Sequence, residues 1–175
     1  MTGDPIIILV RGPLAVGKST IATLLTGFLH PCAHIEVDTL RKMPSDGDLS
    51  ERHLRLAKTN AALLARRFVA EGYSVVIDSA FVERRWLDLV ESELAGVGAP
   101  VRTVTLGAKL DELERRDAGK ASPNFERVAE VFRNFRADEP AIGIHVETSG
   151  RTPNQVLEKI VEALALERRM PGVQQ

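Results

Sequence analysis

Short apolar runs alternate along the chain with longer segments in which apolar residues recur at helical spacing. The short runs are rich in β-branched residues, which favours buried strands, and they cover residues 6–10, 33–37, 73–77, 101–106 and 142–146. The longer segments are predicted helices and cover residues 21–29, 48–71, 83–94, 110–117, 125–135 and 153–169. Because strands that alternate with helices form right-handed βαβ units, the pattern predicts an α/β fold with one parallel five-stranded sheet.

The longest predicted helix begins near residue 48 and ends before Gly72. Its apolar residues recur at intervals of three and four positions, which places them on one face. We expect this face to pack against the sheet through a stripe that consists of Leu54, Ala57, Ala61, Leu64 and Phe68.

The first apolar run leads directly into a glycine-containing stretch, Gly12-Pro13-Leu14-Ala15-Val16-Gly17-Lys18-Ser19-Thr20. A strand, the pattern Gly-x-x-x-x-Gly-Lys-Ser and a helix together form the full context of a P-loop, which binds nucleotide phosphates. Gly12 and Gly17 let the backbone turn its N–H groups toward a phosphate, and the start of the helix adds the positive end of its dipole. Lys18 is expected to contact the β- and γ-phosphates, and Ser19 to bind Mg²⁺. The alternative, a glycine-rich turn that binds nothing, does not account for this full context.

Polar residues follow the other predicted strands. Ligands of open parallel sheets bind beyond the carboxyl ends of the strands. We therefore expect one edge of the sheet to bring together the P-loop, Asp38, Asp78, the start of segment 107–120 and residues 148–150.

Asp38 follows the second predicted strand, and Arg41 comes about one helical turn later. A carboxylate at this edge is suited to accept the proton of a hydroxyl group, and the guanidinium to hold an acceptor or a developing charge. The competing interpretation is that Asp38 caps a short helix and that Arg41 is a solvated surface charge. The location on the ligand-binding edge favours the catalytic interpretation.

Asp78 ends the third predicted strand, after Val75-Val76-Ile77. An apolar strand that ends in aspartate is a Walker B-like pattern when it accompanies a P-loop, and its carboxylate holds Mg²⁺, often through water. We therefore expect Ser19 and Asp78 to bind the metal. The following loop is expected to line the pocket of a phosphate acceptor with Ser79, Phe81 and Glu83.

The segment from about 109 to 136 carries basic residues near a predicted break at Gly119. Arg116 and Lys120 are spaced i, i+4, which places them on one face if the helix extends that far, and Arg115 is adjacent. A mobile basic lid would neutralise a transferring phosphoryl group and exclude water. The alternative is a solvated charged surface, balanced by Asp111, Glu112 and Glu114.

The composition limits the remaining classes of function. The length of 175 residues fits one domain, which we expect to span residues 1–175, and the net charge of −1 argues against a basic footprint for nucleic acid. Cys32 is the only cysteine, which excludes an internal disulfide, and the four histidines lack metal-ligand spacing. No apolar run reaches the roughly 20 residues that span a bilayer, and the first residues lack the basic flank of a signal peptide. A cytoplasmic protein without membrane contact is therefore expected.

Together these motifs resemble the small P-loop kinases, in particular the group that includes chloramphenicol phosphotransferase and the kinase domain of polynucleotide kinase. The resemblance spans nearly the whole chain and is carried by residues 12–20, Val37-Asp38-Thr39-Leu40-Arg41, Val76-Ile77-Asp78, Glu114-Arg115-Arg116 and residues 146–153. It implies a sheet of strand order 2-3-1-4-5, the use of ATP and Mg²⁺, and phosphoryl transfer to a hydroxyl group.

The resemblance also implies roles for individual residues. Asp38 matches the position of the family's base, and Arg115 or Arg116 matches lid arginines that contact phosphates or stack on the base. Thr148 lies in the stretch that resembles the family's base-contacting loop. One departure is Ala15, where many relatives have a third glycine, because alanine adopts positive φ angles poorly.

The sequence therefore predicts an enzyme that transfers a phosphoryl group from a nucleoside triphosphate to a hydroxyl of a small molecule such as an antibiotic, a nucleoside or a sugar. ATP is the expected donor. The guanine-specifying Asn-Lys-x-Asp pattern is absent. GTP stays an option nevertheless, since kinases of this type select the base through other contacts. A second possibility is a non-catalytic nucleotide-binding switch, which has no use for the carboxylate of Asp38. A third is a kinase of nucleic-acid 5′-hydroxyl ends. Its basic patch would consist of Arg52, Arg55, Lys58, Arg66, Arg67, Arg84 and Arg85, although acidic neighbours reduce the positive charge of this patch.

Overall fold

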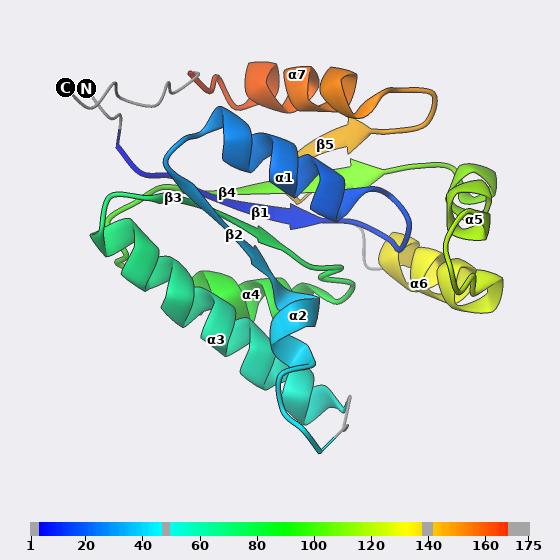
Figure 1. The fold of residues 1–175 in the computed structure, drawn as a ribbon, viewed down its shortest axis with the longest axis horizontal. Coiled ribbons are helices and arrows are strands. Elements are labelled where there is room, and N and C mark those ends of the chain that lie inside the picture. The colour runs from blue at the N-terminus through cyan, green and yellow to red at the C-terminus, as the bar shows by residue number, and fades with distance from the viewer. Residues whose placement is uncertain (1–3, 47–49, 138–141, 168–175) are drawn as a thin grey trace.

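The computed structural model describes residues 4–46, 50–137 and 142–167 and contains the predicted parallel sheet (Figure 1). Its strands are β1 (Ile7–Arg11), β2 (Cys32–Glu36), β3 (Ser74–Asp78), β4 (Val101–Gly107) and β5 (Ile144–Glu147). All neighbouring strands pair in parallel, in the order β2-β3-β1-β4-β5. The predicted fold class and strand order are therefore confirmed, and the carboxyl ends of the strands share one edge of the sheet.

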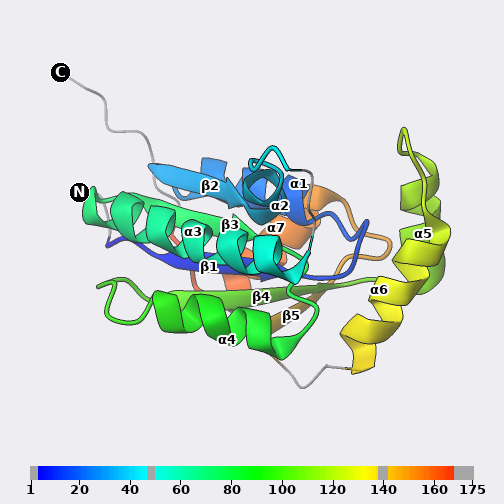
Figure 2. The same cartoon turned by 90° about the horizontal axis from the view of Figure 1, so that it is seen from below.

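Helices cover both faces of this sheet (Figures 1 and 2). One face carries α1 (Lys18–Phe28) and α7 (Pro153–Ala163), and the other carries α3 (Glu51–Ala70) and α4 (Arg84–Glu93). In β1, Ile8 and Val10 pack with the first pair of helices, whereas Ile7 and Leu9 pack with the second pair. Burying each of these side chains contributes about 1.5–3 kcal/mol. The uninterrupted apolar run of β1 thus follows from its central position.

The remaining described helices lie at the carboxyl-end edge. α2 (Val37–Arg41) directly follows β2, whereas α5 (Leu110–Ala118) and α6 (Phe125–Ala137) pack together beyond the sheet (Figure 2). Since α5 ends at Ala118, with Gly119 as its cap, the helix stops short of Lys120 and the shared face expected for Arg116 and Lys120 does not form. None of the described helices is both long enough and apolar enough to cross a membrane.

Two element boundaries differ from the prediction for backbone reasons. β5 begins at Ile144 because Gly143 has φ of 66°, and a Cβ there would overlap the carbonyl oxygen of Thr103. α7 ends at Ala163 because Ala165, with φ of 49°, leaves the helical region. The predicted helix of residues 153–169 is therefore too long, because residues 164–167 are not helical. Residues 168 and 169 lie outside the described part of the chain. The same holds for residues 48 and 49, at the predicted start of α3.

The buried face of α3 is rotated from the predicted stripe. Ala57 and Ala61 are buried as expected, whereas Leu64 is 41% exposed. Ala62, Ala65 and Val69 complete the buried face in its place. Leu54 and Phe68 of the predicted stripe are partly buried against the same apolar cluster, so Leu64 is the member that turns away from it. The small alanines let the helix approach the sheet closely.

Lys58 is an exception to the apolar character of this face, because only 1% of its surface is exposed. Its Nζ donates a hydrogen bond to Ser79 Oγ at 3.0 Å and lies 3.9 Å from the centre of the Phe81 ring. No carboxylate in the described part of the chain lies within ion-pair distance of it. Burial lowers the pKa of Lys58 to about 7, an effect that Asp38 partly offsets and Arg41 reinforces.

This burial predicts a pH-dependent stability. In the unfolded chain the lysine keeps its ordinary pKa of 10.5, so folding penalises the charged amine below that value, and the penalty is complete below pH 7. Lys58→Met removes the penalty and should be more stable than the wild type at pH 7. The difference should shrink as the pH rises from 7 toward 10, by up to about 1.4 kcal/mol per pH unit.

Urea denaturation at several pH values between 7 and 10 measures this difference. Lys159→Met, which replaces an exposed lysine of α7, is the control and should show no pH-dependent difference from the wild type. Parallel stability profiles of the wild type and Lys58→Met would contradict titration of Lys58 in the folded state.

Candidate functional site

The stretch between β1 and α1 is a tightly constrained turn. Gly12 has φ of 152°, and a Cβ there would lie 2.6 Å from the carbonyl oxygen of Leu106, so only glycine fits. Gly17, with φ of 100°, is the N-cap of α1. Ala15 has φ of 62°, the left-handed region that glycine adopts freely, at a cost on the order of 1 kcal/mol. The loop therefore keeps a glycine-type conformation despite the alanine.

The other predicted residues of this stretch lie in two environments. Pro13 and Val16 are buried, and Leu14 packs against the apolar cluster of α1 and α7. Ser19 and Thr20 are exposed on the first turn of α1. The apolar members thus anchor the loop, and the hydroxyl groups remain accessible.

Lys18 begins α1 and folds back over the loop. Its Nζ donates hydrogen bonds to Gly12 O at 3.2 Å and to Pro13 O at 3.0 Å. Burial lowers the pKa of Lys18, and the nearby carboxylates of Asp78 and Asp38 partly offset this effect. The predicted edge of the sheet thus brings the lysine and both aspartates within electrostatic range of one another.

Oxygen-bearing side chains meet beside the first turn of α1. Ser19 Oγ donates to Glu36 Oε1 at 3.4 Å, and Glu36 Oε2 accepts from Thr39 Oγ1 at 2.6 Å. Glu36 and Asp78 are register partners at the ends of β2 and β3. Asp78 is only 2% exposed, and its Oδ2 lies 3.5 Å from His34 Nε2. Hydrogen bonding to this carboxylate raises the pKa of His34.

These donors fit a magnesium ion that is shared with a nucleotide. Mg²⁺ prefers oxygen ligands and is usually held by one or two protein groups together with phosphates and water. Asp78 Oδ2 is buried, and apart from His34 Nε2 at 3.5 Å it has no polar partner among the described residues. No group of three or more His, Cys, Asp or Glu side chains among residues 4–46, 50–137 and 142–167 forms a metal site by itself. The candidate ligands are the predicted Ser19 and Asp78, with Glu36 as an addition.

Asp38 lies exposed in the first turn of α2, but it does not cap this helix, because the N-cap is Glu36. Burial lowers the pKa of Lys18 and the pKa of Lys58, and the negative charge of Asp38 partly offsets this effect at both amines. Arg41 is half-buried, and its Nε is buried without a hydrogen-bond partner among the described residues. The interpretation of the pair as a helix cap and a solvated charge therefore does not describe this structure.

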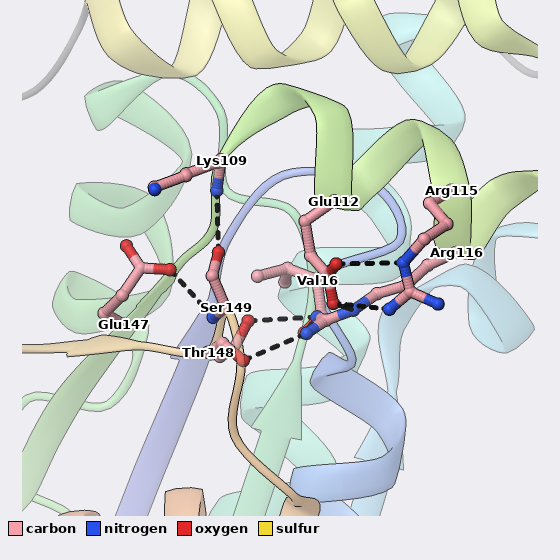
Figure 3. A network of polar contacts seen from close by, with 8 residues as sticks. All are labelled: Val16, Lys109, Glu112, Arg115, Arg116, Glu147, Thr148 and Ser149. Carbon is pink, nitrogen blue, oxygen red and sulfur yellow. Dashed lines mark hydrogen bonds and ion pairs between the residues drawn. The ribbon is translucent and has the colours of Figure 1, made fainter.

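Arg116 joins three segments of the chain (Figure 3). Its guanidinium donates to Val16 O at 3.1 Å, to Thr148 Oγ1 at 3.0 Å and to Thr148 O at 3.0 Å. Its Nε donates to Glu112 Oε1 at 2.9 Å. A pocket of about 280 Å³ lies beside this network and is lined by residues that include Val16, Gly17, Thr20, Arg116, Thr148 and Pro153. The predicted P-loop and the predicted base-contacting loop thus line one pocket.

The basic residues of segment 109–136 do not share one environment. The side chain of Arg115 is 72% exposed and pairs with a glutamate of its own helix, whereas that of Arg116 is 24% exposed (Figure 3). Lys120 pairs with Asp117 at 2.8 Å. Its positive charge also lowers the pKa of Lys18, in addition to the larger effect of burial, whereas the nearby carboxylates raise that pKa. Among the three, Arg116 makes the direct contacts with the loop of Lys18.

Sequence reasoning gave no site role to Glu36 and placed Lys58 only in a surface patch. Glu36 shares the last register position of its strand with Asp78, which is a signal that needs the strand alignment. Lys58 is four residues after Leu54 and three before Ala61, on the apolar face of the predicted helix. A charged residue on such a face is the signal that could have identified it.

Solved structures share this fold over nearly the whole chain. A sugar kinase from Janibacter sp. HTCC2649 is 18% identical, with a TM-score of 0.70, and the match covers 92% of this chain and 95% of that one. The tunicamycin resistance protein of Deinococcus radiodurans is 21% identical, with a TM-score of 0.74 and coverage of 95% and 99%. The APS kinase of Mycobacterium tuberculosis, in complex with AMPPNP and APS, is 16% identical, with a TM-score of 0.72 and coverage of 93% and 99%.

The similarity to these structures shows a shared P-loop fold. No curated protein matches the sequence. The sequence profile of AAA_33, an AAA domain, matches residues 7–140, which include the P-loop, Asp38, Asp78 and both arginines of α5. The chain therefore belongs to the AAA_33 family of AAA domains.

Proposed function

We propose that this protein is an ATP- and Mg²⁺-dependent phosphotransferase that moves the γ-phosphoryl group to a hydroxyl of a small molecule. The observation that carries the proposal is the exposed carboxylate of Asp38 at the carboxyl-end edge of the sheet, where its charge acts on the amines of both Lys18 and Lys58. A nucleotide-binding switch has no use for a carboxylate at this place. The shared fold with a sugar kinase, a tunicamycin resistance protein and an APS kinase supports small-molecule phosphoryl transfer.

The P-loop holds the donor in this proposal. Its backbone N–H groups and the N-terminus of α1 bind the phosphates, and Lys18 exchanges its two carbonyl partners for phosphate oxygens. Ser19 and Asp78, with Glu36 in reach, would hold Mg²⁺, which would neutralise charge on the phosphates during transfer. Arg116 holds Val16 and Thr148 in place beside the pocket, which the nucleoside of ATP or GTP would occupy.

Asp38 serves the acceptor. The acceptor oxygen forms a bond to the γ-phosphorus, the bond from that phosphorus to the leaving oxygen of the diphosphate breaks, and the hydroxyl proton passes to Asp38. In a loose transition state this proton leaves late, so the carboxylate mainly orients the attack and then accepts the proton. Arg41 contacts the acceptor or the transferring group.

Residues 109–136, which include α5 and α6, act as a lid on the same single domain of residues 1–175. Within the small P-loop kinases, the resemblance to the chloramphenicol phosphotransferase and polynucleotide kinase group favours a hydroxylated antibiotic, nucleoside or sugar as acceptor. Nucleic acid is less well supported, because three of the seven residues of the basic patch form ion pairs and Lys58 is buried. Those pairs are Arg67 with Glu71, Arg84 with Asp88 and Arg85 with Glu51.

The donor site is tested with Lys18→Ala. Loss of the amine removes a phosphate contact but no core contact, so ATP affinity should fall and turnover should decrease by roughly 10²–10³-fold while the fold persists. ADP release with Mg²⁺·ATP and with Mg²⁺·GTP over a panel of hydroxyl acceptors measures turnover, and Lys159→Ala on α7 is the matched control. Wild-type turnover by Lys18→Ala would reject the P-loop assignment.

Asp38→Asn separates a kinase from a switch. The amide keeps the shape but cannot accept the proton, so kcat should fall by roughly 10²–10⁴-fold while ATP affinity stays within about twofold. Both quantities are measured on one preparation. Equal losses of affinity and turnover would make Asp38 a nucleotide or metal ligand, and full activity would exclude it as the base.

The two arginines of α5 should differ in their effect on nucleotide binding. Arg116→Ala removes three hydrogen bonds to Val16 and Thr148, so ATP affinity should weaken by roughly 10-fold or more. Arg115→Ala is the matched control, since the side chain of Arg115 is 72% exposed and its hydrogen bonds within the described residues go to Glu112 of the same helix. The ATP affinity of this variant should change less than about threefold. Titration with a fluorescent ATP analogue measures both variants. Similar losses in the two variants would show that the network in Figure 3 rearranges around the nucleotide.

A further inference from the structure

We propose that Lys58 and Arg41 bind an anionic group of the acceptor, so that the preferred substrate is a hydroxylated compound that also carries a carboxylate, sulfate or phosphate group. The inference rests on the phosphotransferase function proposed above and names the substrate class of the same site.

The amine of Lys58 lies at the reaction edge of the sheet. It contacts Ser79 and Phe81, which belong to the loop that follows β3 and its terminal Asp78. That loop is tied to the start of the P-loop, because Gly12 N donates to Ala80 O at 3.3 Å and Arg11 donates to Phe81 O at 3.0 Å. Lys58 therefore reaches from α3 into the candidate site.

The charge on Lys58 lacks a matching anion. An ammonium group has three donors, and the one hydrogen bond of this amine within the described residues goes to Ser79 Oγ at 3.0 Å. The rings of Phe81 at 3.9 Å and Trp86 at 6.0 Å attract a cation but accept no conventional hydrogen bond. A buried charge without a counterion is costly, and a ligand that carries one would remove the cost.

Arg41 adds a second cation on α2, which packs against α3, the helix that carries Lys58. Its Nε is buried and unbonded within the described part of the chain, and its charge lowers the pKa of Lys58 after the larger effect of burial. The negative charge of Asp38, also on α2, acts on Lys58 without an ion-pair contact, and its proposed role is to accept a proton from the acceptor. The group of three side chains therefore retains a net positive charge that an anionic acceptor would balance.

Phe81 positions the amine at a conformational cost. Its φ of 43° is uncommon for a bulky residue, and such strain persists only where the surroundings maintain it. The ring is 1% exposed and lies under Nζ, while the carbonyl accepts from Arg11. The strained backbone thus keeps an aromatic face beneath the cation.

An anionic acceptor should also depend on the protonation of Lys58, whose pKa is about 7 because of burial. The groups that face this amine are Asp38 and Arg41 of α2, Ser79 and Phe81 of the loop, and Trp86 of α4, on whose ring Arg55 and Arg85 also lie. Because the charged amine binds the anion, kcat/KM for an anionic acceptor should fall as the pH rises above 7.

Matched acceptor pairs test the proposal: gluconate with glucose, glycerate with glycerol, and adenosine 3′-monophosphate with adenosine. The wild type should phosphorylate the anionic member of at least one pair with a kcat/KM roughly 10–100-fold higher. Lys58→Met should abolish this preference mainly through KM and remove the decline above pH 7. Lys58→Arg should retain part of the preference, and Lys159→Met should behave as the wild type.

A binding measurement without turnover completes the test. In protein saturated with Mg²⁺·AMPPNP, which occupies the phosphate positions of the donor, sulfate should raise the melting temperature of the wild type more at pH 6.5 than at pH 8.5, relative to chloride at equal ionic strength. Lys58→Met should lose this difference.

The outcomes separate the two proposals. Preference for neutral acceptors, equal losses for both members of a pair, or equal stabilisation of the wild type and Lys58→Met by sulfate would overturn the anion site and leave the kinase intact. Absence of phosphorylation of every acceptor, with the sulfate effect retained, would reject the kinase and support the anion site.

Discussion

The close approach of two strands at Gly12 is the constraint on which the rest of the site depends. β1 lies between β3 and β4, and the carbonyl oxygen of Leu106 in β4 leaves no space for a side chain where β1 ends. The chain must turn there, and Lys18 at the start of α1 takes its position from that turn. Because all strands run in parallel, Asp78 and the residues after β2 arrive at the same edge.

Charge is distributed unevenly along this edge. Lys18 has two aspartates within electrostatic range, whereas Lys58 is buried against a hydroxyl group and aromatic rings and Arg41 has a buried, unbonded Nε. Burial in an apolar environment disfavours charge at Lys58 and lowers its pKa to about 7. The fold tolerates the free-energy cost of burying Lys58 at the place where the proposed acceptor binds. In our proposal, an anionic group of the acceptor supplies the negative charge that balances Lys58.

The amino-acid sequence by itself determined the architecture and predicted at which edge of the sheet the candidate site lies. Short β-branched runs that alternate with amphipathic segments define βαβ units from local residues alone, and the strand order implied by the family resemblance is confirmed. The predicted loop of residues 12–20 rests on local signals, which are two glycines and the start of a helix, although the need for glycine at position 12 comes from Leu106 of β4. Asp38 and Asp78 could be placed at strand ends because the direction of a parallel sheet fixes which end binds ligands.

Only the tertiary structure decided which polar side chains point into the site. The burial of Lys58 depends on a loop 21 residues away in sequence, and the contacts of Arg116 with Val16 and Thr148 span 100 and 32 residues. Arg115 and Arg116 are adjacent and chemically identical, so no local pattern distinguishes the one that turns inward. Apolar periodicity records which face of a helix is buried on average, whereas the partner of a single buried charge depends on segments that meet only when the chain folds.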